Sequence, residues 1–244
     1  MNPLKRLARV STDIVMLVNG QRRVSDKTRR ALVPSKLRTE LVDAAKRAAE
    51  RGLVVANLSE ISARVGGGRL VINRQGAWLA DLSAGDLAVL PARSDRSILG
   101  LAPSRHAAWH RLIYESTEAA AVLLCQPASA LLAAGLNRSP DPDVLPDAAD
   151  LVGDLMVVEP QDRTIKAALE GRSALLIRGH GLLVWGPSPM AAVGLAETAN
   201  AWCRASIGAE RLPGSTQLED EESGDHLRSG LVLGGGEQPH TQIR

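Results

Sequence analysis

The sequence has 244 residues, of which 45% are hydrophobic and 2% aromatic, so we expect one domain with a core of aliphatic side chains. A formal net charge of +2 argues against a nucleic-acid-binding protein, which usually carries a clustered basic face. Cys125 and Cys203 are too few for a disulfide framework, and no apolar run is long enough to cross a membrane. We therefore expect a soluble protein of the reducing cytoplasm, with no nucleic-acid and no membrane partner.

The first half of the chain is expected to form one helix followed by short strands. Residues 1–34 predict an irregular arm, and Ser35 is a suitable N-cap for an amphipathic helix that ends at Gly52. The segments that follow are short, rich in branched residues and separated by turn residues, which is typical of antiparallel strands. They comprise residues 53–56, 61–65, 69–73 and 87–90.

The second half is expected to mix helices and strands. The helices comprise residues 104–116, 128–136, 162–170 and 188–206, and the strands residues 119–125, 173–177 and 182–185. Residues 137–146 hold three prolines and predict a loop, and the acidic and glycine-rich residues 211–244 predict a flexible tail. This order indicates an α/β fold with three αβα layers over residues 35–210, in which helices flank a central, mainly antiparallel sheet.

Three segments carry motifs that together resemble a known family. They are Glu60-Ile61-Ser62-Ala63-Arg64 with Gly76, then Pro103-Ser104-Arg105-His106 with His110 and Tyr114, then Arg178-Gly179-His180-Gly181. These segments are similar to the N-terminal strand signature, the Pro-Ser-Ser-Glu helix start and the late His-Gly segment of the class II aldolase/adducin family, which includes fuculose-phosphate and rhamnulose-phosphate aldolases. The resemblance covers about residues 35–206. It implies the family fold and a homo-oligomer, commonly a tetramer with the active site between subunits.

The resemblance also implies a metal site that is incomplete here. Family enzymes bind a divalent metal, commonly zinc, through a His-x-His pair on a strand and a later His, while a Glu at the helix start moves the proton. With Pro127 as the guide, the pair falls on Leu123 and Cys125, and the later His falls on His180. Leu123 has no donor atom, whereas Cys125 could bind metal as a thiolate. Zinc is therefore an expected cofactor, but one of its three implied ligands is missing.

Other family positions carry different residues as well. The Glu falls on His106, the second Ser of Pro-Ser-Ser falls on Arg105, and the Asn that helps to hold a substrate phosphate falls on Glu60. A carboxylate at Glu60 would repel a phosphate, while Arg105 would attract one. The predicted site comprises His106 and Glu60 as catalytic residues, Ser104, Arg105 and Gly76 as substrate-binding residues, and His180 and Cys125 as metal ligands.

These replacements leave several functions open. The favoured hypothesis is a divergent family member that has lost the standard zinc-dependent aldolase reaction and is either non-catalytic, as the adducin head domain is, or altered in activity. The alternative is a carbon–carbon lyase, an aldolase or decarboxylase of a small hydroxy-carbonyl or sugar-derived compound, with a metal site rebuilt from His180, Cys125 and His106. A third is a metal-free enzyme or small-molecule binding protein. The structural alternatives are a buried apolar role for Cys125 and a salt bridge for Glu60.

Overall fold

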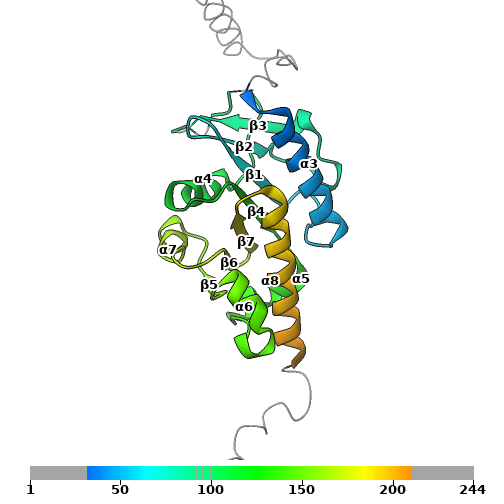
Figure 1. Ribbon diagram of the computed structural model, residues 1–244, viewed down its shortest axis with the longest axis vertical. Helices are drawn as coiled ribbons and strands as arrows, with labels where there is room; N and C mark the ends of the chain where they lie inside the picture. The colour runs from blue at the N-terminus through cyan, green and yellow to red at the C-terminus, as the bar shows by residue number, and fades with distance from the viewer. Residues whose placement is uncertain (1–31, 92, 95, 99, 210–244) are drawn as a thin grey trace, which may run out of the picture. The chain divides into compact units, whose positions relative to one another are not determined.

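The computed structural model describes residues 32–91, 93–94, 96–98 and 100–209, which belong to one compact unit (Figure 1). The predicted tail at 211–244 lies outside the described residues, as does the predicted arm apart from residues 32–34. Within the described part, no helix combines the length and the apolar character that a membrane span requires.

The centre of the fold is a seven-stranded sheet in the order β3-β2-β1-β4-β7-β6-β5. Its strands are β1 (Glu60–Val65), β2 (Arg69–Asn73), β3 (Leu87–Leu90), β4 (Ala121–Cys125), β5 (Val157–Val158), β6 (Ala174–Ile177) and β7 (Gly181–Gly186). Only the β5–β6 pair is parallel. The other five neighbouring pairs are antiparallel, which confirms the predicted mainly antiparallel sheet.

Helices cover both faces of the sheet, so the predicted three-layer αβα arrangement is confirmed (Figure 1). One face carries α3 (Ser35–Glu50), α5 (Ala128–Leu136), α6 (Pro146–Val152) and α8 (Pro189–Ala209). The other face carries α4 (Ala107–Ser116) and α7 (Asp162–Ala167). Three short 3-10 helices, η1 (Leu79–Asp81), η2 (Ala84–Asp86) and η3 (Pro142–Val144), lie in the connections.

The two faces of the sheet form two separate apolar clusters, because side chains alternate along each strand. On β1, Ile61 and Ala63 belong to the cluster under α3 and α8. On β4, Leu123 and Cys125 belong to the same cluster, whereas Leu124 packs on the α4 side. We call these the α8 face and the α4 face. The candidate site lies on the α4 face.

Several sequence predictions differ from the structure. The strand predicted at residues 53–56 is a loop, because the Leu53 N–H bonds to the Ala48 carbonyl at the end of α3 and Ala56 adopts a positive φ of 46°. The predicted cap Ser104 instead donates its hydroxyl proton to the Asn73 carbonyl, so α4 begins only at Ala107. Helix α6 and strand β5 were not predicted.

Candidate functional site

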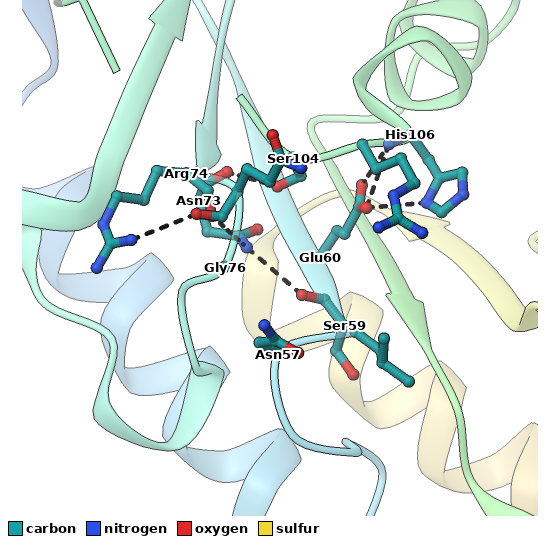
Figure 2. Close-up of a pocket in the computed structure, with 11 residues that line it drawn as sticks. Asn57, Ser59, Glu60, Asn73, Arg74, Gly76, Ser104 and His106 are labelled. Atoms are coloured by element: carbon teal, nitrogen blue, oxygen red, sulfur yellow. Dashed lines mark hydrogen bonds and ion pairs between the residues drawn. The ribbon is translucent and has the colours of Figure 1, made fainter. Parts of the chain in front are cut away.

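A buried carboxylate meets an imidazole where β1 begins and α4 starts (Figure 2). Glu60 is the first residue of β1, lies on the α4 face and is 4% exposed. Its Oε1 is 2.8 Å from His106 Nδ1, and the His106 backbone N–H donates to both carboxylate oxygens at 3.2 Å. The carboxylate thus satisfies the free N–H at the start of α4 and selects the ring tautomer with its proton on Nδ1. In neutral His106, Nε2 is then a proton acceptor.

The pocket beside this pair is small, about 180 Å³, and polar. It is lined by Asn57, Leu58, Ser59, Glu60, Asn73, Arg74, Gln75, Gly76, Ser104, Arg105 and His106. The structure thus brings five predicted site residues to one cavity: His106, Glu60, Ser104, Arg105 and Gly76. The volume is below the roughly 300–1,000 Å³ of sites for drug-sized ligands, so the cavity suits a small molecule.

The two arginines that line the pocket differ in whether their charge is paired with a carboxylate. Arg74 Nε donates to Asp86 at 2.8 Å, so the charge of this guanidinium already has a carboxylate partner. Arg105 is exposed and has no hydrogen bond or ion pair within the described residues. Gly76 adopts φ +76°, a conformation that glycine permits. Arg105 is therefore the lining cation best placed to meet an anionic group.

His180 joins the same site from the turn between β6 and β7. Its ring centroid lies 5.0 Å from that of His106 and 5.1 Å from that of Trp109. Its Nδ1 is 3.0 Å from the Arg178 carbonyl, so Nδ1 carries the proton and Nε2 is left open. The prediction of His180 at the site agrees with this position, while Trp109, stacked on His106 at 4.4 Å, was missed.

A third histidine, on α4, lies beneath the site. His110 is fully buried, with Nδ1 2.7 Å from Ser62 Oγ and Nε2 3.6 Å from Glu60 Oε2. Ser62 Oγ is also 2.7 Å from the Tyr114 hydroxyl. Burial lowers the pKa of His110 from 6.5 to about 4, against the opposing attraction of Glu60. The ring is therefore neutral at physiological pH.

The comparison with known proteins gives the family of this fold and site. The family model of the Class II Aldolase and Adducin N-terminal domain matches residues 39–207, more than half of the chain. The chain belongs to the class II aldolase and adducin family. Among curated proteins, none matches the sequence.

Solved structures share the class II aldolase fold at low identity. An L-fuculose-1-phosphate aldolase from Thermus thermophilus is 22% identical, with 73% of this chain and 98% of that chain covered and a TM-score of 0.65. A sugar-phosphate aldolase from Thermotoga maritima is 18% identical, with 73% and 97% covered and a TM-score of 0.57. An L-fuculose 1-phosphate aldolase from Glaciozyma antarctica is 18% identical, with 80% of each chain covered and a TM-score of 0.60. These likenesses show the fold.

The predicted metal ligand Cys125 is not brought together with the other site residues. Its side chain is buried in the apolar cluster of the α8 face, together with Leu123, whereas the His180 ring contacts Trp109 and His106 on the α4 face. Burial raises the pKa of the Cys125 thiol far above its ordinary value, which disfavours the thiolate that binds metal. The structure supports the apolar alternative for this cysteine.

Leu124, rather than Leu123 or Cys125, faces the candidate site from β4. It lies opposite Glu60 in the β1–β4 register, and Gln126 follows two residues later, just after the strand ends. A pair of side chains that reaches the α4 face from this strand must include alternate residues such as Leu124, one position away from the predicted 123 and 125.

The side chains present do not fit zinc. Leu124 has no donor atom, and Gln126 Oε1 accepts the Ser59 hydroxyl proton at 2.6 Å. Zinc sites in proteins are usually built from three or four His, Cys, Asp or Glu ligands. Across the described ranges, no group of three such residues is arranged to hold a metal ion.

Proposed function

We propose that this chain has lost the zinc-dependent aldolase reaction of its family and that its pocket performs metal-independent acid–base chemistry on a small polar molecule. The observation that carries the proposal is the chemistry of Leu124, which faces the site from β4, and of Gln126, which follows the strand. If the imidazole pair of the family projects toward the α4 face, it falls on these two residues, and neither side chain is a usual zinc ligand.

The Glu60–His106 pair supplies the chemistry that remains. Because Glu60 holds the proton of His106 on Nδ1, the open Nε2 can take a proton from a bound molecule, and the carboxylate stabilises the imidazolium that forms. Return of that proton to another atom of the molecule completes the transfer without net oxidation or reduction. The open Nε2 of His180, whose ring lies 5.0 Å from that of His106, offers a second site for the proton.

The pocket suggests the kind of molecule that binds. The charge of Glu60 is directed to His106, and Arg105 faces the pocket without a carboxylate partner among the described residues, which supports a ligand with one anionic group. Ser104 is less available, because its hydroxyl proton is donated to the Asn73 carbonyl. A small hydroxy-carbonyl compound with a carboxylate matches this lining.

The proposal is tested first by metal binding. Protein purified without chelators and then exposed to zinc is expected to retain less than one equivalent after desalting, and to show no cleavage of L-fuculose 1-phosphate. The double variant Leu124→His/Gln126→His is the matched positive control, since it adds two imidazoles beside His180 and should retain zinc. Stoichiometric zinc in the unmodified chain, lost in His180→Ala, would sink the proposal in favour of the rebuilt lyase.

The acid–base part is tested separately by proton exchange. In EDTA-treated D₂O buffer, the carbon-bound protons of hydroxypyruvate, a small hydroxy-carbonyl probe with a carboxylate, are expected to exchange faster with the protein than without it. His106→Gln should abolish this gain, while Cys203→Ser, a change in the core of the α8 face, should keep it. Exchange no faster than buffer would instead favour a non-catalytic member of the family.

We also propose that the chain forms a homo-oligomer and works in a reducing compartment such as the cytoplasm. Val55, Leu58 and Trp78 are 44%, 52% and 54% exposed on the segments around the pocket, and exposed apolar side chains of this size favour an interface. Both cysteines are free and buried, which suits a reducing compartment. Light scattering should show a multimer that Trp78→Lys weakens; a monomer in both would contradict the assembly.

A further inference from the structure

Five polar side chains form a continuous ladder between β1 and α4. Glu60 and Ser62 project from alternate positions of β1, while His106, His110 and Tyr114 recur every four residues from the start of α4. Four helical residues rise about 6.0 Å and two strand residues about 6.8 Å, so the two series stay in step. The contacts are Glu60–His106 at 2.8 Å, His110–Ser62 at 2.7 Å and Ser62–Tyr114 at 2.7 Å.

The direction of the hydrogen bonds along this ladder follows from Tyr114, at which the series ends. Within the described residues, Ser62 Oγ is the one hydrogen-bond partner of the Tyr114 hydroxyl, so the Tyr114 proton is donated to that oxygen. The Ser62 hydroxyl then donates to His110 Nδ1. The reverse direction would leave the buried Tyr114 proton without an acceptor, which is costly. With Nδ1 as an acceptor, the single proton of neutral His110 lies on Nε2.

That proton points at the carboxylate that holds His106. His110 Nε2 is 3.6 Å from Glu60 Oε2 and has no hydrogen-bond partner within the described residues. A distance of 3.6 Å is too long for a hydrogen bond but leaves a buried N–H dipole directed at the negative charge. The two oxygens of Glu60 therefore serve different rings, Oε1 that of His106 and Oε2 that of His110.

We infer that His110, fixed as its Nε2–H tautomer by Ser62 and Tyr114, is a positioning residue of the site, which directs its N–H at Glu60 Oε2 and so keeps Glu60 Oε1 on the His106 ring. The inference rests on the proposed function, because His106 is the residue that meets the ligand. His110 itself is fully buried behind Glu60 and does not line the pocket. With Oε2 facing the His110 N–H, the carboxylate stays in the orientation that holds the proton of His106 on Nδ1.

The test uses side-chain ¹⁵N NMR of the full chain in EDTA. At pH 7.5, His110 should show a protonated Nε2 and an unprotonated Nδ1, and neutral His106 should carry its proton on Nδ1. In His110→Asn, whose amide reaches only the Nδ1 position, His106 should show a mixture of both tautomers, because nothing then fixes the orientation of Glu60. In His110→Gln, whose amide nitrogen can occupy the Nε2 position, the single Nδ1–H tautomer of His106 should return.

The other charged and titratable groups that face His110 are Glu60, His106 and Tyr114, with Arg64 beyond Tyr114, and all are unchanged in both variants. A protonated Nδ1 on His110, or the same His106 tautomer in all three proteins, would overturn the inference. A purely structural role would lower stability in both variants without separating Asn from Gln. Repeating the spectra with one equivalent of zinc distinguishes a failure of this inference from a failure of the proposed function. Shifted or slowly exchanging resonances of His106 and His180 would contradict the proposed loss of zinc binding. The tautomer of His110 would still be read from the His110 resonances.

Discussion

Acidification should destabilise the fold through one buried ring, His110. In the folded chain, burial lowers the pKa of His110 to about 4, whereas in the unfolded chain the ring titrates near 6.5. Between these values the unfolded state binds a proton that the folded state does not, so stability falls as the pH falls from 6.5 to 4. Since a pKa difference of one corresponds to about 1.4 kcal/mol, the free energy of unfolding should drop by about 3 kcal/mol.

The measurement is urea unfolding at 25 °C, followed by tryptophan fluorescence at several pH values from 7 to 4. The His110→Gln variant is the control, because it keeps a polar side chain but cannot take up the proton. It should lose stability at every pH, by about 1–3 kcal/mol for the altered bond to Ser62, and show a flatter dependence below pH 6.5. If the gap between the two proteins stays constant across this range, His110 ionises equally in both states and the reasoning fails.

Two further predictions concern the geometry of the site. Gly181→Ala should cost about 3 kcal/mol or more, because Gly181 has φ +99° and a Cβ there would lie 2.4 Å from the Cys125 carbonyl oxygen. Gly179→Ala, at φ +73° but in open space, should cost only about 1 kcal/mol, and equal losses in thermal unfolding would contradict this. His106→Glu places a second carboxylate against Glu60 and should cost roughly 2–3 kcal/mol, most of which Glu60→Asn should restore in the double variant; additive losses would refute the coupling.

The fold was predictable because its signals are local. The amphipathic pattern of α3, the Pro189 start of α8 and the turn glycines between β1 and β2 are each contained in a few residues. The missed elements lacked such signals: β5 is only two residues long, and α6 follows a proline-rich stretch. The wrong strand at 53–56 shows that a run of apolar residues can instead complete a helix end.

The candidate site was predictable only in part. The residues around the pocket came from three motifs, each contained in one short segment, and five of the predicted residues line one cavity. The sequence of β4 could not show which of its residues face the site, because all five of its side chains are buried between helices on both faces of the sheet. No polar alternation therefore marked which residues face α4. The β1–β4 pairing, which no single strand contains, supplies that information by placing Leu124 opposite Glu60.

The substitutions at this site depend on one another. A carboxylate that is 4% exposed and opposite a leucine is costly unless donors surround it, and Glu60 has the backbone N–H and Nδ1 of His106 together with the dipole of His110. An imidazole in place of Leu124 would bring a metal ligand toward that same carboxylate. With Leu124 in this position, Glu60 keeps its hydrogen bonds to His106. Under the proposed function, the absence of an imidazole pair beside β4 and the presence of the Glu60–His106 pair are two parts of one change, from chemistry centred on a metal to chemistry centred on a ring nitrogen.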